Sequence, residues 1–365
     1  MKLRFTLLAT FAFLLAAGCI QAQPAQFNFP IELETRTFKG LPELHSYCWA
    51  QNEGKWLIMS GRNNGLHGFQ PPNAFPTANQ NQLIYVIDPV NNTVHSASVS
   101  GLPADIAEQV SATNLNFHQS GDTLVLIGGY GYSTSAAVYK TFPSLLIIDV
   151  PGLTNAIVAG TSITPYFTRI ADEQMAVTGA YLSRLNGIYY LVFGHRFDGR
   201  YNPMGGPSYT QTYTETVRRF RIVDDNGNAA IEYEASWNDP THFHRRDYNL
   251  APSRNSDGTH SLMAFTGVFR SDMDLPHTTS VRVNGNDYMV DSSFVQMLNQ
   301  YHTALLPSWS ENDQVMRTFF FGGIAQFYID DNQELVEDSL VPFSRNISYI
   351  EQGSGALLPR EVSGC

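Results

Sequence analysis

The chain has 365 residues and a formal net charge of −11 at pH 7, with 43% hydrophobic and only 15% charged residues. This composition excludes an intrinsically disordered chain, and the acidic balance argues against nucleic acid as a partner. After the first 22 residues no segment approaches the roughly 18 consecutive apolar residues of a membrane-spanning helix, so we expect a soluble folded domain.

The N-terminus has the pattern of a bacterial export signal. A basic start, Met1–Arg4, precedes an apolar run from Phe5 to Ala17, which is too short for a comfortable membrane span. We therefore predict a signal peptide over residues 1–22 and an exported protein that is periplasmic, anchored to the outer membrane or extracellular. Two processing sites stay open: cleavage before Gln23, which we favour, and a lipobox-like Ala16–Cys19 that would lipidate Cys19 and give the only membrane attachment.

Further along the chain, one hairpin pattern occurs five times. Each copy is an apolar strand, a polar turn with Gly, Asp or Asn, and a second apolar strand that closes at glycine. Near-continuous hydrophobicity in these strands predicts burial on both faces. The closing glycine suits a tight backbone turn near a crowded axis. The five copies lie at 45–62, 114–130, 180–196, 248–267 and 301–323, and they close at Gly61, Gly129, Gly194, Gly267 and Gly323.

Between these hairpins lie further strands, so each period contains four. We expect the segment 144–151 to pair with a strand around Ala156, and the segment Phe29–Phe38 to form a strand that closes a ring with the last unit. The stretch from Asp105 to Val110 is the best helical candidate. The other strand pairs are expected at 82–89 with 93–97, 217–222 with 230–234, and 280–283 with 288–290.

These repeats resemble kelch repeats of the galactose-oxidase-type β-propeller. The resemblance covers roughly residues 41–352 and rests on Gly128-Gly129 and Gly322-Gly323, on single glycines in the other units, and on strands that close in Asp-Pro or Asp-Val-Pro. It implies an all-β, kelch-like β-propeller over residues 29–365 with five recognisable four-stranded blades. Either the ring has five blades, or the chain is truncated at its C-terminus and belongs to an incomplete ring of six.

The repeat also predicts where a binding site lies. Residues after each closing glycine share one propeller face with the residues that open the first strand of each hairpin, because the two strands are antiparallel. Propellers bind ligands over the central channel, and arginine, histidine and tyrosine suit carboxylated or polyhydroxylated ligands. That face also carries His45 and Arg246. The predicted ligand-binding residues are Arg62, Asn63, His67, Tyr130, His195, Arg196, Asp247, Arg270 and His302.

Three functions remain open. The first is a non-enzymatic exported module that binds a glycan or a protein on the channel face. The second is a sugar-active enzyme of mutarotase or lyase type on the same face, for which the kelch-type sialic acid mutarotase is the nearest resemblance. The third is a structural module of a larger surface protein, in which charged residues on this face form ion pairs between blades.

No cofactor or metal site is expected. His242 and His244 lie two apart near Asp239, but an exposed loop around Pro240 explains them better than metal binding. The copper site of galactose oxidase is not carried over, because no matching Tyr, His and Cys cluster occurs. A disulfide between Cys48 and Cys365 is permitted by an exported compartment but not required.

Overall fold

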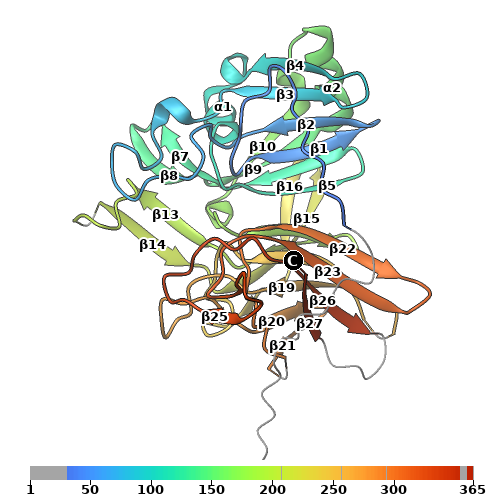
Figure 1. The fold of residues 1–365 in the computed structure, drawn as a ribbon. Coiled ribbons are helices and arrows are strands. Elements are labelled where there is room, and N and C mark those ends of the chain that lie inside the picture. The colour runs from blue at the N-terminus through green and yellow to red at the C-terminus, as the bar shows by residue number, and fades with distance from the viewer. Residues whose placement is uncertain (1–30, 207, 256, 293, 354–359, 365) are drawn as a thin grey trace, which may run out of the picture.

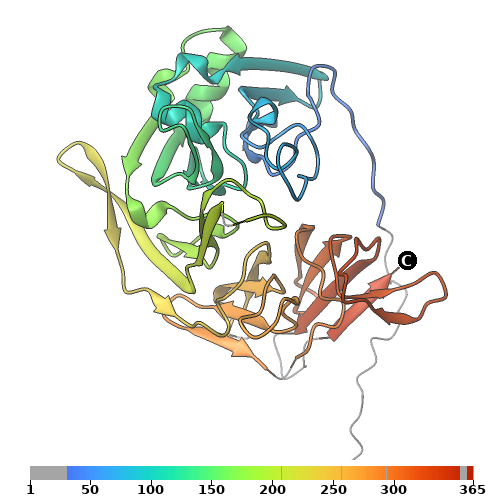
Figure 2. The same cartoon turned by 90° about the vertical axis from the view of Figure 1, so that its left-hand side faces the viewer.

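The computed structural model describes residues 31–206, 208–255, 257–292, 294–353 and 360–364. The predicted signal peptide, both processing sites and Cys365 lie outside these residues. None of the helices in the described ranges is long and apolar enough to cross a membrane. The described chain forms five antiparallel sheets that stand around a central axis, each with four strands in its main path, so the predicted all-β propeller with five blades is confirmed (Figures 1 and 2).

Each blade is built from strands that follow one another in the sequence, from the innermost to the outermost. Blade 1 contains β1 (Cys48–Asn52), β2 (Lys55–Met59), β3 (Leu83–Asp88) and β4 (Thr93–Ser98). Blade 2 contains β5 (Asn116–Ser120), β6 (Thr123–Ile127), β9 (Ser144–Asp149) and β10 (Phe167–Ala171). Blade 3 contains β11 (Tyr181–Leu185), β12 (Ile188–Val192), β15 (Thr216–Asp225) and β16 (Asn228–Tyr233), with the short β17 (Trp237–Asn238) paired to β15.

The last two blades follow the same plan. Blade 4 contains β18 (Asn249–Arg254), β19 (His260–Phe265), β20 (Ser280–Val283) and β21 (Tyr288–Asp291). Blade 5 contains β22 (Ala304–Ser310), β23 (Val315–Phe321), β26 (Ile347–Gly353) and β27 (Arg360–Gly364). Three extra hairpins are inserted between the second and third strands of blades 2, 3 and 5: β7 (Tyr130–Ser133) with β8 (Val138–Thr141), β13 (His195–Gly199) with β14 (Tyr209–Tyr213), and β24 (Phe327–Ile329) with β25 (Leu335–Glu337).

Two helices accompany the blades. The predicted helical stretch forms α1 (Ala104–Val110). The strand expected around Ala156 was wrong, because this segment forms α2 (Val150–Ala159) and β9 pairs instead with β10. The Asp149 side chain accepts a hydrogen bond from the backbone N–H of Gly152, and Gly160 ends the helix in the left-handed conformation, so both ends are capped.

The structure explains why a glycine closes each hairpin. Two successive residues adopt positive φ at every closing turn, for example Ser60 at 66° and Gly61 at 81°. A Cβ atom on Gly61 would lie 2.6 Å from the carbonyl oxygen of His45, and one on Gly323 would lie 2.6 Å from that of Tyr301. Close neighbours, which are backbone atoms at Gly61 and Gly323 and the Leu115 side chain at Gly129, leave no room for a Cβ at the second position. The first position accepts Ser60, Phe193 or Thr266.

Apolar clusters fill four of the blade interfaces, but the seam between blades 5 and 1 differs. Separate clusters join blade 1 to 2, blade 2 to 3, blade 3 to 4 and blade 4 to 5. At the seam, Phe38 and Leu41 pack on blade 1, and Ile31 packs on Phe319 and Tyr349 of blade 5. The predicted ring-closing strand was wrong over its described part, residues 31–38, which contains no strand. Its two ends contact the blades through the side chains of Ile31 and Phe38, and the residues between them are exposed.

Candidate functional site

One backbone arrangement, repeated in all five blades, brings the site residues together. In each blade, a residue just before the innermost strand forms a β-bridge with the residue that directly follows the closing glycine. His45 pairs with Arg62 in this way, and Thr178 pairs with His195. The next residue of the inner strand adopts positive φ in every blade, with values between 52° and 63°. We call these five residues the inner ring: Ser46, Asn114, Gly179, Asp247 and His302.

A cavity of about 170 Å³ opens on the side of the inner ring where the closing turns lie, and we call it the charged pocket. Its walls come from the inner-strand openings, the loop after Gly61 and the inserted hairpin β13–β14. Six of the nine residues predicted from the sequence line it: Arg62, His67, Tyr130, His195, Asp247 and His302.

Arg62 is the most unusual group in this pocket. It is 3% exposed, and it forms no ion pair with a carboxylate in the described part of the chain. Its guanidinium donates to the carbonyl of Gly65 at 3.0 Å, to Oγ1 of Thr113 at 3.4 Å and to Nδ1 of His45. A guanidinium has five N–H groups, so these three bonds leave two for a ligand. Burial lowers the pKa of Arg62 to about 10, which keeps it charged at neutral pH.

The second arginine has a partner. Nη1 of Arg246 lies 2.9 Å from Oδ2 of Asp247, and its Nε donates to the hydroxyl of Tyr213 at 3.1 Å. Burial by itself would raise the pKa of Asp247, but Arg246 and nearby imidazoles bring it below the usual value. Two guanidinium groups and one carboxylate therefore leave one positive charge in excess, before any imidazole is counted.

Two histidines of the pocket are neutral at pH 7. Burial and the charge of Arg62 lower the pKa of His45 to about 4, and burial and Arg246 lower that of His195 to about 3. Because Nδ1 of His45 accepts from Arg62, its Nε2 carries the hydrogen and faces Nε2 of His302 at 3.4 Å. Nδ1 of His195 accepts from the amide of Gln211 at 2.8 Å. The Nε2–H of His195 is therefore an uncharged donor in the pocket lining, whereas that of His45 is directed at His302.

Aromatic rings line the pocket beside these polar groups, and the guanidinium of Arg62 lies over the Phe75 ring, 5.1 Å from its centroid. The His67 imidazole stacks on Phe75 with ring centroids 4.3 Å apart and meets Tyr201 edge-on at 4.9 Å. Tyr130 fixes the neighbouring loop, because its hydroxyl donates to the carbonyl of Gly199 and accepts from the N–H of Tyr201. The pocket therefore combines an excess positive charge with a rigid aromatic wall.

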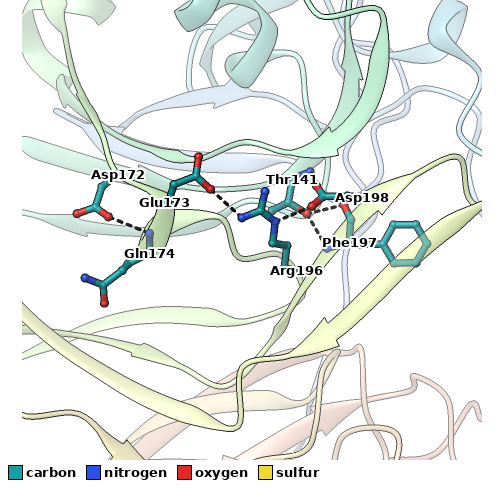
Figure 3. A network of polar contacts seen from close by, with 7 residues as sticks. All are labelled: Thr141, Asp172, Glu173, Gln174, Arg196, Phe197 and Asp198. Carbon is teal, nitrogen blue, oxygen red and sulfur yellow. Dashed lines mark hydrogen bonds and ion pairs between the residues drawn. The ribbon is translucent and has the colours of Figure 1, made fainter.

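Three predicted residues lie outside the pocket lining. Arg196 turns away and pairs with Glu173 at 2.8 Å and Asp198 at 2.6 Å (Figure 3). It follows His195 on β13, and successive side chains of a strand point to opposite faces. Asn63 is exposed and accepts from Asn79, and Arg270 forms a bidentate pair with Asp272.

Several lining residues have no repeated sequence signal. Phe75 comes from the loop between β2 and β3, Tyr201 from the loop between β13 and β14, and Gln211 from β14 itself. All three lie between the second and third strands of blades 1 and 3, where the connecting segments differ in length and structure from blade to blade, so no comparison between repeats could align them.

The residues considered for metal binding do not converge. His242 bonds to Asp239 at 2.9 Å, whereas His244 bonds to Glu215 at 2.7 Å. No group of three or more candidate metal ligands occurs within the described ranges. The Cys48 thiol is buried on the innermost strand of blade 1, whereas Gly364 pairs with Ile347 on the outermost strand of blade 5. The proposed bridge to Cys365 lies outside the described residues.

Comparison with known proteins supports the fold alone. No protein-family model matches the chain, and no curated protein matches it by sequence. The chain is similar to the solved structure of YjhT, with a TM-score of 0.52 and 12% identity over 90% of this chain and 86% of that one. The similarity agrees with a propeller, and membership of the kelch family stays a prediction.

Proposed function

We propose that this chain is an exported binding propeller whose charged pocket takes a small carboxylated ligand, and specifically an acidic sugar. The observation that carries this proposal is the buried guanidinium of Arg62, which lacks a carboxylate partner in the described chain. A buried charge is costly unless it is paired, and the flat fork of a guanidinium fits a carboxylate. A ligand carboxylate would supply the missing partner.

The other walls of the pocket favour a sugar as the bearer of that carboxylate. Tyr201, which meets Phe75 edge-on, adds an aromatic ring that can pack on the apolar face of a sugar ring. His195 and Gln211 supply uncharged hydrogen-bonding groups for hydroxyls. A formed cavity with these groups also supports ligand binding over a purely structural role.

The test is calorimetric titration of the chain from Gln23 onward with glucuronic acid, galacturonic acid and N-acetylneuraminic acid, each beside an uncharged counterpart. We expect saturable binding of at least one acid, and a loss of roughly 10- to 150-fold in Arg62→Met, as charged hydrogen bonds contribute about 1.5–3 kcal/mol. Arg270→Met is the matched control, since Arg270 is bound to Asp272 outside the pocket.

Circular dichroism identifies any variant that fails to fold, and Arg62→Lys serves as a second probe. Lysine keeps the charge but loses the fork, so it should bind with intermediate affinity. Equal binding of an acid and its uncharged counterpart, or full affinity in a folded Arg62→Met protein, would overturn the proposal.

A second candidate function is catalysis of sugar ring opening in the same pocket. It is favoured by the carboxylate of Asp247 beside His302 and by the neutral imidazoles of His45 and His195, which are groups able to exchange protons. Proton NMR of freshly dissolved anomers tests it. Interconversion no faster than in buffer would exclude this activity and leave binding intact.

A further inference from the structure

A second and larger cavity, of about 680 Å³, opens on the other side of the inner ring. It is lined by the inner strands β1 and β5 and by the start of β11. Asn114, Asp247 and His302 line both cavities, so the two are adjacent across the inner ring. We call this second space the neutral cavity.

The neutral cavity differs from the charged pocket in its chemistry. Among the described residues that line it, Asp247 is the one Asp, Glu, Lys or Arg, and it belongs to the shared boundary. Burial lowers the pKa of the His118 imidazole in this wall, so it is neutral at pH 7. Gln51 and Gln119 bridge blades 1 and 2, since the amide of Gln119 accepts from the backbone N–H of Gln51 at 2.8 Å and donates to its carbonyl at 2.7 Å.

Two large aromatic side chains stand open in this cavity. Trp49 is 47% exposed and Tyr47 is 41% exposed, although both belong to the inner edge of blade 1. Trp49 alternates along β1 with the fully buried Cys48 and Ala50, and its ring meets Phe117 of blade 2 edge-on at 6.3 Å. Exposed aromatic rings in a concave site, set among uncharged amides, are typical of a surface that a ligand covers.

We infer that the neutral cavity binds uncharged sugar units attached to the acidic sugar of the charged pocket, so that the ligand is an oligosaccharide with one acidic terminal residue. This inference rests on the proposed function. The two cavities are adjacent across Asn114, Asp247 and His302, so an oligosaccharide that occupies both would pass between these residues. The two arginines that line these cavities, Arg62 and Arg246, both belong to the charged pocket. The acidic end of the ligand is therefore assigned to the charged pocket.

The experiment compares each acidic sugar with the same sugar extended by neutral units. The probe pairs are N-acetylneuraminic acid with 3′-sialyllactose and glucuronic acid with glucuronosyl-xylotriose, titrated into the chain from Gln23 onward. We expect the extended probe of the pair that binds to gain roughly 3- to 10-fold in affinity. Trp49→Ala should abolish that gain, Trp49→Phe should keep part of it, and neither should change binding of the single acidic sugar.

Phe343→Ala is the matched control, since Phe343 is a 62% exposed aromatic residue on the loop before β26. Binding of the single sugar without any gain for the extended probe overturns this inference and leaves the proposed function standing. The inference is also overturned if the extended probe keeps its higher affinity in Trp49→Ala. It is overturned as well if an uncharged peptide with a free C-terminal carboxylate binds as tightly as the extended probe. No binding of any single acidic sugar overturns the proposed function and this inference together.

Discussion

The charged pocket and the neutral cavity lie on opposite sides of the same inner ring, yet they have different chemistry. The charged pocket holds Arg62, Arg246 and Asp247, whereas the neutral cavity adds no Arg, Lys, Asp or Glu of its own among the described residues that line it. The backbone around both is the same fivefold arrangement of turns and inner strands.

The difference comes from the elements that supply the side chains. The charged pocket takes its residues from strand openings, closing turns and inserted hairpins, where the chain can vary without loss of the sheet. The neutral cavity takes Trp49 and its neighbours from strands whose alternate residues fill the blade interfaces. The propeller thus separates an electrostatic site from a stacking surface, and this separation can be tested.

The largest effect should follow from acid, and His195 in the charged pocket is one of its sources, together with the buried His45 and His277. His195 is 7% exposed and its pKa is lowered to about 3, so between pH 6.5 and 4 the unfolded chain binds a proton that the folded chain does not. Stability should therefore fall as the pH falls through this range, by about 3 kcal/mol from this residue. Urea titrations at pH 7, 5.5 and 4 measure the loss.

The matched variant is His195→Asn, whose side-chain oxygen can still accept from Gln211 but does not titrate. It should reduce the dependence on pH by the share of His195 and leave the share of His45 and His277, while Trp49→Ala in the neutral cavity should leave the slope unchanged. The same slope in His195→Asn and in the parent chain would contradict a buried neutral imidazole at this position.

The next effect in size concerns the boundary that both cavities share. Asp247→Asn removes the partner of Arg246 but keeps a residue that tolerates the observed φ of 52°. Because the two side chains are only 22% and 19% exposed, we expect a loss of about 1–3 kcal/mol in unfolding free energy. A freed Arg246 should also raise the affinity for acidic sugars several-fold, which is opposite to the effect of Arg62→Met.

The control for that variant is Asp272→Asn, which breaks the more exposed pair with Arg270 and should cost less than about 0.5 kcal/mol. A weaker rather than stronger affinity for the acid in Asp247→Asn would mean that Asp247 itself contacts the ligand. That result would favour the enzyme reading, in which this carboxylate accepts a proton.

The five repeated hairpins made the propeller blades predictable from the sequence. The charged pocket was only partly predictable, because some of its lining comes from segments that do not repeat. Gly61 and its equivalents have positive φ and no room for a Cβ, so their spacing marks the blades directly. In contrast, alternating Ile31, Leu33 and Thr35 suggested a strand, but Ile31 packs on blade 5 without backbone pairing and Leu33 is 69% exposed. Alternation by itself does not supply a pairing partner.

Side-chain direction explains the errors within the site. Arg62 and His195 follow the closing turns and enter the pocket, whereas Asn63 and Arg196, one step further, turn away. The two-residue period of a strand would have excluded Arg196 once His195 was accepted. Phe75 lies in a loop whose course depends on tertiary contacts, such as the hydrogen bond from Tyr139 to its carbonyl, so its place could not be predicted.

The smallest expected effect separates the two regions by their response to salt. Ions screen the attraction between Arg62 and a ligand carboxylate only in part, because Arg62 is buried, so raising salt from about 0.05 to 0.5 M should weaken the single acidic sugar a few-fold. Stacking on Trp49 involves no net charge, so the ratio of affinities between the extended and single probes should stay constant. Calorimetry at three salt concentrations measures both quantities. A ratio that falls in parallel with the single-sugar affinity would show that the neutral units also depend on charge, and the division between the two cavities would then be wrong.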